Sequence, residues 1–189
     1  MDSFELMRER IEQANTPAQF GLNKGNYGVV TMHRPSNVDD KAKLETIVGE
    51  LIKAQGQLPI IFPVHPRTRK QLEQFSLWDE VQGLDQLILT EPLSYLPFMS
   101  LVLHAKFVLT DSGGIQEETT YLDIPCLTLR DNTERPITLT QGTNKLITPS
   151  DILSSIKQVL KGDWPHGRKP DLWDGKTAQR ILEDLRHRS

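Results

Sequence analysis

Short apolar runs recur along the chain, separated by longer polar or amphipathic stretches. Six runs stand out, at 27–32, 59–64, 86–92, 106–111, 125–130 and 144–149. Near-continuous apolar runs of this length are typical of strands that are buried on both faces. Between the first two runs, the apolar positions follow a helical period over 41–55, at Leu44, Ile47, Val48, Leu51 and Ile52. The alternation predicts an α/β fold, a Rossmann-like doubly wound parallel sheet of about six strands with helices on both faces.

The two ends of the chain have a different character. Residues 1–25 are charged and helix-forming and predict a helix and a linker, so we place the main domain at 26–189. Within that domain, 163–175 is rich in Pro, Gly and Trp and predicts a surface segment, followed by a closing helix over 177–188. The start is unlike a signal peptide, and no apolar run reaches the length of a membrane span. We therefore expect a cytoplasmic protein with no membrane partner.

Composition and charge narrow the function classes. The chain has 189 residues, with 37% hydrophobic and 25% charged residues, as in ordinary soluble globular proteins. Its net charge of −3, without a basic block, argues against nucleic acid as a partner. The single cysteine, Cys126, lies in an apolar run, which predicts a buried thiol and excludes an internal disulfide. No Cys/His spacing indicates a metal site.

Polar and charged residues follow five of the apolar runs. The segments are "HRPSN", "HPRTR", "EPLSYLPF", "DSGGIQEE" and "RDNTERP". In a parallel sheet the carboxyl ends of the strands meet at one edge, where ligands bind. The clustering therefore predicts a binding site at this edge.

The segment "DSGGIQEE" has the residues for an anion site. The backbone N–H groups at a helix start are unpaired and positively polarised, which suits a phosphate or diphosphate. Gly113 and Gly114 would let the anion approach without a Cβ in the way. The alternative is a simple N-cap by Ser112 with a flexible turn. The spacing matches neither the dinucleotide fingerprint nor the Walker motif, so both interpretations stay open.

Glu117 and Glu118 follow in the first turns of that helix. Both complement the helix dipole, and one of them could instead accept hydrogen bonds from ribose hydroxyls. Neighbouring helical residues point about 100° apart, so we expect only one to face a ligand.

The other strand ends carry residues with two possible roles. His33–Arg34 and His65–Arg67 are either surface residues or positive charge around the same anion. Phe98 is either a core side chain or part of the site. Arg130, Glu134 and Arg135 form either a surface charge cluster or a ligand-binding arginine with its orienting glutamate.

Several of these segments together resemble the non-hydrolysing UDP-N-acetylglucosamine 2-epimerases, which have the GT-B architecture of two Rossmann-like domains. The matching segments run in the family's order, from "HRPSNVDD" and "PVHPRTR" through "EPLSYLPFMSLVLHAKFVLTDSGGIQEE" to "PCLTLRDNTERPITLTQGTNKLI" and "WDGKTAQRILEDL". The resemblance covers nearly the whole chain from residue 27 onward. It implies that this chain is the second, C-terminal domain.

The resemblance also implies roles for individual residues. His33 corresponds to the catalytic histidine at the diphosphate. The implied UDP-binding residues are Leu93 and Phe98 at uracil, Ser112, Gly113 and Gly114 at the diphosphate, Glu118 at the ribose, and Arg135. Arg34 and His65 correspond to positions that bind a second, regulatory UDP-sugar in some members.

The family interconverts UDP-GlcNAc and UDP-ManNAc by eliminating UDP and adding it back, which needs no cofactor and no metal. Its full-length members are usually homodimers. The carboxylates with proton-transfer roles lie in the first domain, which this chain lacks. We therefore expect a UDP-binding half that is inactive alone.

Three other functions stay open at this point. A UDP-sugar-dependent GT-B glycosyltransferase also holds its nucleotide with a Gly-rich loop and a glutamate. A non-catalytic nucleotide-binding module would need no partner domain, and a hydrolysing epimerase would release free N-acetylmannosamine. Acceptor-dependent sugar transfer would indicate the glycosyltransferase. Turnover restored by adding a separate N-terminal domain would exclude the non-catalytic module.

Overall fold

A six-stranded, fully parallel sheet forms the centre of the protein, in the order β3-β2-β1-β4-β5-β6. The structure is a computed structural model that describes residues 1–188. The strands are β1 (Gly28–Thr31), β2 (Ile60–Pro63), β3 (Leu87–Thr90), β4 (Phe107–Thr110), β5 (Cys126–Leu129) and β6 (Asn144–Ile147). Each lies inside a predicted apolar run, so the predicted Rossmann-like α/β fold is confirmed.

The strand order reverses between β1 and β4, which lie side by side with Gly28 opposite Phe107 and Thr31 opposite Thr110. A Cβ on Gly28 would come within 2.2 Å of the Phe107 ring, so only glycine allows this close pairing. In doubly wound sheets the reversal opens a crevice at the carboxyl ends of these two strands. The residues after β1 and β4 are therefore placed to form a site.

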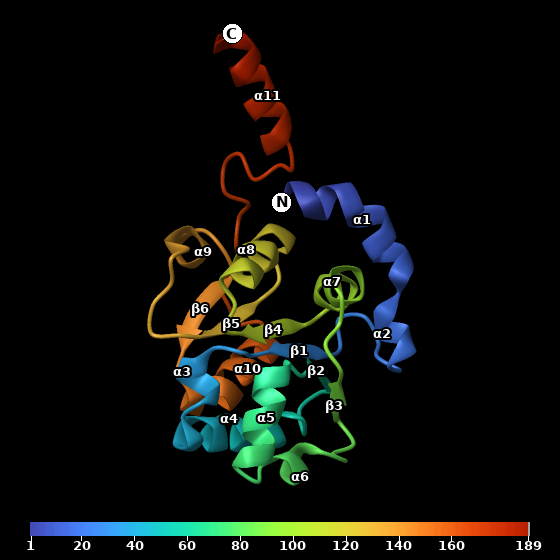
Figure 1. Cartoon of the computed structure of the whole chain (residues 1–189), viewed down its shortest axis with the longest axis vertical. Helices are drawn as coiled ribbons and strands as arrows, with labels where there is room; N and C mark the ends of the chain where they lie inside the picture. The colour runs from blue at the N-terminus through green and yellow to red at the C-terminus, as the bar shows by residue number, and fades with distance from the viewer. Residues whose placement is uncertain (189) are drawn as a thin grey trace.

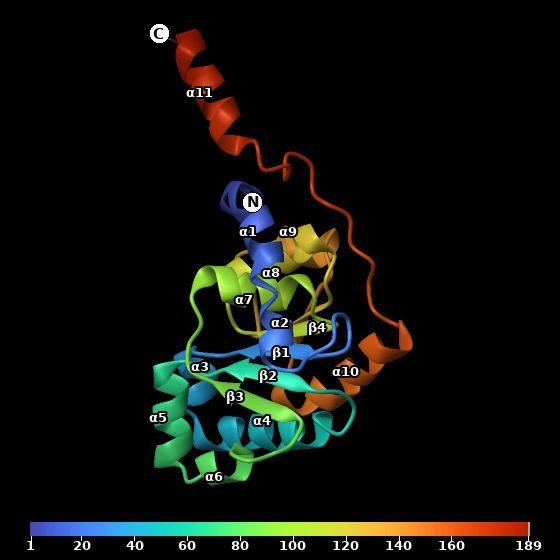
Figure 2. The ribbon, with the colours of Figure 1, turned by 90° about the vertical axis from the view of Figure 1, so that its right-hand side faces the viewer.

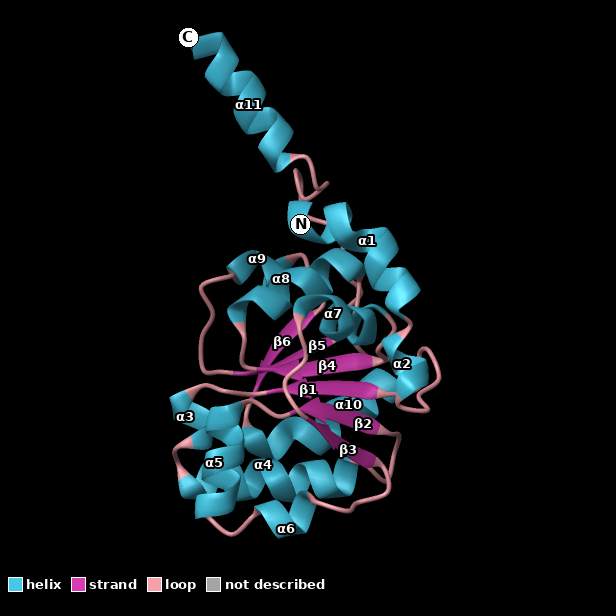
Figure 3. Cartoon of the chain, turned by 45° about the vertical axis from the view of Figure 1, so that its right-hand side comes forward, coloured by secondary structure: helices cyan, strands magenta, loops and turns pink. Residues whose placement is uncertain are grey.

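Helices cover both faces of the sheet, as Figures 1 and 3 show. On one face lie α1 (Asp2–Ala14), α2 (Thr16–Gln19), α7 (Tyr95–Leu103), α8 (Gly113–Leu122) and α9 (Pro136–Thr140). On the other lie α3 (Pro35–Val38), α4 (Lys41–Ala54), α5 (Pro66–Gln74), α6 (Trp78–Val81) and α10 (Ile152–Lys161), with a short 3₁₀ turn, η1 (Pro149–Asp151), before α10.

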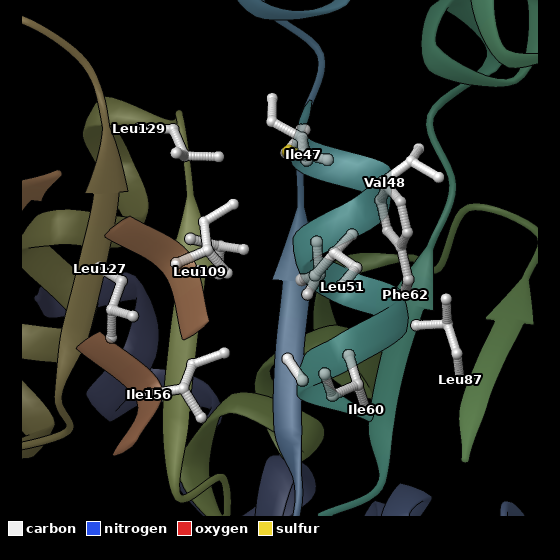
Figure 4. Close-up of a cluster of buried hydrophobic side chains, with 14 of the residues drawn as sticks. Ile47, Val48, Leu51, Ile60, Phe62, Leu87, Leu109, Leu127, Leu129 and Ile156 are labelled. Atoms are coloured by element: carbon white, nitrogen blue, oxygen red, sulfur yellow. The ribbon is translucent and has the colours of Figure 1, made fainter. Parts of the chain in front are cut away.

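The predicted helix over 41–55 is α4, and its apolar stripe contributes to the larger core cluster, together with side chains of the sheet and of other helices. Figure 4 shows Ile47, Val48 and Leu51 of this helix facing the side chains of the sheet. Cys126 is buried in β5 with a free thiol, as predicted. Burial raises the pKa of this thiol to about 11.

The second core cluster joins the N-terminal helix to the domain. Phe4 and Ile11 of α1 are buried against residues of α7 and the sheet. The segment predicted as a helix and linker thus contributes core side chains. The domain boundary at residue 25 stays a prediction.

The C-terminal helix α11 (Thr177–Arg188) forms as predicted and projects away from the domain in Figures 1 and 2. None of its residues is buried, and Ile181, Leu182 and Leu185 are more than half exposed. The preceding segment, 163–175, is mostly exposed and without helix, as predicted, but Trp164 is buried, and its Nε1 donates to the Thr143 carbonyl at 2.7 Å. Among residues 1–188, no helix is both long and apolar enough to cross a bilayer.

Candidate functional site

Asp111 is the central residue of the crevice between β1 and β4. It follows β4 directly and is fully buried. Its carboxylate accepts hydrogen bonds from the backbone N–H groups of His33 at 3.1 Å and Arg34 at 2.9 Å, and from Asn37 Nδ2 at 3.2 Å. A buried carboxylate needs several donors to offset its desolvation. Asp111 therefore fixes the turn that follows β1.

The same carboxylate orients the His33 ring. His33 Nδ1 lies 3.1 Å from Asp111 Oδ1, and the side chain is 42% exposed. Nε2 has no partner among residues 1–188, so it is the ring nitrogen that can reach a ligand. The His65 ring is close, with its centroid 5.5 Å from that of His33. His65 Nδ1, however, accepts from the Arg67 N–H at 3.1 Å and caps helix α5.

Helix α8 begins beside His33 without a side-chain cap. Ser112 occupies the N-cap position, but its hydroxyl makes no capping bond, and its own N–H donates to Thr110 Oγ1 at 3.0 Å. The first N–H groups of a helix have no partner within the helix. An uncapped start leaves them for another acceptor, and the dipole favours an anion.

Neither glycine at this start is required by the packing of the chain itself. A Cβ on Gly114 would meet no atom within 4 Å, and one on Gly113 would only approach Glu134 Oε2, at 3.9 Å. Neither residue has the positive φ that favours glycine. The missing side chains instead leave open space over the N–H groups, which is the space that an anion would need.

A cavity of about 240 Å³ lies next to this helix start. It brings together five of the predicted residues, His33, His65, Leu93, Phe98 and Ser112, and is completed by Thr31, Pro63, Pro92 and Ile115. Phe98 is half-buried: it packs against the second core cluster and also lines this cavity, while its role in a binding site stays a prediction. The cavity has an apolar wall at Leu93 and Phe98 and a polar wall at His33 and Ser112.

The two glutamates of α8 have different partners. Glu117 forms an ion pair with Arg135, with 2.8 Å between Glu117 Oε1 and Arg135 Nε. The geometry of this contact is not that of a hydrogen bond, so Arg135 Nε has no hydrogen-bond partner among residues 1–188. Glu118 Oε1 accepts from the Tyr95 hydroxyl at 3.1 Å. Burial raises the pKa of Glu118, and the bond from Tyr95 opposes that shift. Burial and the Glu118 charge raise the pKa of Tyr95 to about 12.

Arg130 is a stronger candidate for ligand binding than its position in the sequence indicated. Its side chain is only 10% exposed, and its Nη2 donates to Glu134 Oε1 at 3.1 Å. Its Nη1 is buried and has no partner among residues 1–188. A buried, unpaired N–H is costly, which points to an acceptor supplied by a ligand. The signal available in the sequence was its place at the end of the fifth apolar run.

A second cavity, of about 220 Å³, has Arg130 in its wall, together with Arg34 and Lys43. His65 lines the first cavity and Arg34 the second, so these two predicted residues do not share a cavity. Arg34 is held in place by a bond from its Nε to the Asp111 carbonyl at 3.1 Å.

Comparison with known proteins relates the sequence of this chain to one family of sugar-nucleotide epimerases. The family model for UDP-N-acetylglucosamine 2-epimerase matches residues 1–186. A UDP-N-acetylglucosamine 2-epimerase from Methanocaldococcus jannaschii is 40% identical over 167 residues, which are 85% of this chain and 44% of that protein. A UDP-2,3-diacetamido-2,3-dideoxy-D-glucuronate 2-epimerase from Pseudomonas aeruginosa is 37% identical over 176 residues, which are 92% and 48%.

Solved structures lead to the same family. The crystal structure of the Methanocaldococcus jannaschii UDP-GlcNAc 2-epimerase in complex with UDP-GlcNAc and UDP matches with a TM-score of 0.83 and 35% identity. The match covers 98% of this chain and 52% of that one. The chain spans about half the length of the curated relatives that it matches. It belongs to the UDP-N-acetylglucosamine 2-epimerase family.

Proposed function

We propose that this chain is the UDP-binding half of an epimerase that interconverts UDP-GlcNAc and UDP-ManNAc. The observation that carries the proposal is the uncapped start of α8, with two glycines that the packing does not require, beside a cavity lined by His33 and Phe98. The names of the relatives support the nucleotide part most strongly, since their substrates share UDP and differ in the sugar.

Each part of UDP has a matching group. Uracil packs on Phe98 with Leu93 at its edge, where the cavity wall is apolar. The diphosphate lies over Ser112, Gly113 and Gly114 on the free N–H groups of the helix. The ribose hydroxyls donate to Glu118. Arg135 and Arg130 add positive charge on the side of the loop.

In the proposed reaction, a base takes the proton from C2 of the sugar, and the bond from C1 to the diphosphate oxygen breaks. UDP leaves, and 2-acetamidoglucal remains. Addition of UDP back to C1, with a proton delivered to the opposite face of C2, gives the epimer. This chain contributes the stabilisation of the leaving diphosphate, through His33 Nε2 and the start of α8. The proton-transfer groups belong to a first domain, so the chain alone is inactive or nearly so.

Calorimetric titration with UDP tests the nucleotide site. We expect UDP to bind and adenosine diphosphate to bind more weakly, because the proposal places uracil, the smaller base, against Phe98 and Leu93. Glu118→Ala should weaken UDP binding by about 1.5–3 kcal/mol, the value of a hydrogen bond to a charged group. Glu45→Ala, on the exposed surface of α4, is the matched control and should change nothing. No UDP binding at millimolar concentration would contradict the proposal.

Mixing the chain with a separately produced first domain of a family member tests the catalytic part. Formation of UDP-ManNAc from UDP-GlcNAc would support the epimerase. Sugar transfer to an added acceptor would indicate a glycosyltransferase, and free N-acetylmannosamine would indicate a hydrolysing enzyme. UDP binding without any turnover in the mixture would favour a non-catalytic module.

A further inference from the structure

Two buried amide side chains lie beneath the loop that carries Arg130 and Arg135. Gln116 is in the second turn of α8, and Asn144 begins β6; both are nearly or fully buried. Asn144 Nδ2 donates to Gln116 Oε1 at 3.1 Å. Amide groups are costly to bury unless they are hydrogen-bonded. Their place between the site and the sheet therefore needs an explanation.

The amide pair holds the Arg135 backbone on both sides. The Arg135 N–H donates to Thr133 Oγ1 at 3.0 Å, and that hydroxyl donates to Gln116 Oε1 at 2.6 Å. The Arg135 carbonyl accepts from Thr138 Oγ1 at 2.7 Å, and that hydroxyl accepts from Asn144 Nδ2 at 3.0 Å. Both backbone polar groups of Arg135 thus connect, through one threonine each, to a buried amide.

Gln116 also reaches the start of its own helix. Its Nε2 donates to the Ser112 carbonyl at 3.3 Å. Asn144 Oδ1 in turn accepts from Thr128 Oγ1 of β5 at 2.6 Å. The network therefore links the proposed diphosphate site, the arginine loop and the sheet. A polar network that is satisfied in this way is rigid and specifies one arrangement of its parts.

We propose that Gln116 is a positioning residue that, through Thr133, sets the arginine loop against the start of α8. The distance of 3.9 Å between Glu134 Oε2 and the Cβ position of Gly113 shows how close the loop lies to that start. The inference rests on the proposed function. It predicts that the network controls recognition of the diphosphate and leaves recognition of uracil unchanged, because Phe98 and Leu93 lie outside it.

Replacement of Gln116 itself by Met is the direct variant, but a buried position carries a risk of misfolding. Thr133→Val removes the same link from the loop side with little change in shape. Thr133→Ser keeps the hydroxyl and should therefore keep the hydrogen bond to Gln116. Thr140→Val is the matched control, since Thr140 is exposed on α9 and only bonds the Pro136 carbonyl.

The experiment compares UDP and uridine by NMR titration in each variant. We expect Thr133→Val to raise the Kd for UDP about tenfold, as one lost hydrogen bond allows. The Kd for uridine should not change, and Thr133→Ser and Thr140→Val should behave as the wild type. An equal loss for UDP and uridine would show a general structural role and overturn the inference. So would unchanged UDP binding in Thr133→Val.

Amide hydrogen exchange without ligand separates this inference from the proposed function. In Thr133→Val we expect faster exchange confined to the amides of residues 130–135, with Thr133→Ser unchanged. If the wild type binds neither UDP nor uridine, the proposed function fails, and exchange alone decides whether the link holds the loop. Unchanged exchange in Thr133→Val then overturns the inference. A localised increase in exchange supports the statement that the link from Gln116 through Thr133 holds the arginine loop.

Discussion

Asp111 Oδ1 lies 3.1 Å from His33 Nδ1, across the point where the strand order reverses. Because Asp111 also accepts the His33 N–H, one buried carboxylate holds both the backbone and the ring of the same residue. The ring is thereby oriented with Nε2 away from Asp111. This is the arrangement that a histidine needs if it is to contact a leaving phosphate without rotating.

Asp111→Asn should destabilise the fold. An asparagine presents an NH₂ group to donors that now face a carboxylate oxygen, and it removes the charge that those donors stabilise. We expect a loss of about 2–4 kcal/mol in the free energy of unfolding, measured by urea denaturation. Asp85→Asn, at an exposed position, is the control. A stability equal to the wild type would mean that the carboxylate does not organise the turn.

Gly114→Ala should leave the fold intact and weaken UDP binding. The space around the Cβ position is empty, and alanine reduces the entropy of the unfolded chain, so stability should rise by about 0.4–1 kcal/mol. The new methyl group would stand where we propose that the diphosphate approaches the helix. We expect the Kd for UDP to rise at least tenfold, measured by calorimetry.

Gly49→Ala is the matched control for this variant. Gly49 lies inside helix α4, and its Cβ position is equally empty. It should give a similar gain in stability with unchanged UDP binding. If both variants bind UDP like the wild type, the diphosphate does not lie over Gly114.

The fold could be predicted from the sequence, but the hydrogen-bond partners in the site could not. Apolar runs identify buried strands because burial is encoded locally, and parallel pairing then places the strand ends at one edge. The Gln116–Asn144 pair is different, since the two residues are 28 positions apart and each alone looks like an ordinary polar residue. The turn that follows β1 depends on Asp111, and this role can be identified only once the donors of His33, Arg34 and Asn37 are in place around the carboxylate.

The arginine loop shows the same limit. By local pattern alone, apart from the family resemblance, Arg130 and Arg135 are two arginines of one charged segment. Burial separates them in the structure, because Arg130 is 10% exposed and Arg135 is 41% exposed. Exposure follows from how the loop folds back on α8, which no local pattern contains. The placement of Phe4 and Ile11 in the core likewise depends on α1 docking against α7.

Glu118→Gln should stabilise the free protein at pH 7 while weakening UDP binding. Burial raises the pKa of Glu118, so the folded state binds its proton more tightly than the unfolded state. Stability from this group is therefore present at low pH and is lost as pH rises through the folded pKa. The amide removes that loss, so the variant should be more stable than the wild type at pH 7, and its oxygen can still accept the Tyr95 hydrogen bond.

Thermal unfolding of the Glu118→Gln variant at several pH values checks this. Its advantage over the wild type should shrink as pH falls, because the wild-type carboxyl then becomes protonated. A constant difference in unfolding temperature between the variant and the wild type across the pH range would contradict the raised pKa of Glu118.

The N-terminal helix should detach more easily in acid, because one carboxylate ties it to α8. Glu5 Oε1 accepts from the Tyr121 hydroxyl at 2.6 Å and pairs with Arg8 Nη2 at 2.6 Å. These bonds, that from Arg8 first, lower the pKa of Glu5 to about 2. Its contribution to stability is therefore fully present above the unfolded pKa near 4.5 and is lost as pH falls toward 2.

Glu5→Gln measures that contribution. The side chain is 30% exposed, so solvent screening reduces the value to about 1–2 kcal/mol. We expect the variant to unfold at a lower temperature than the wild type at pH 7 and at nearly the same temperature at pH 2. Glu9→Gln, exposed on the same helix, should follow the wild type at both pH values. A deficit of the same size at pH 2 and pH 7 would mean that packing of the side chain, and not its charge, holds α1 to α8.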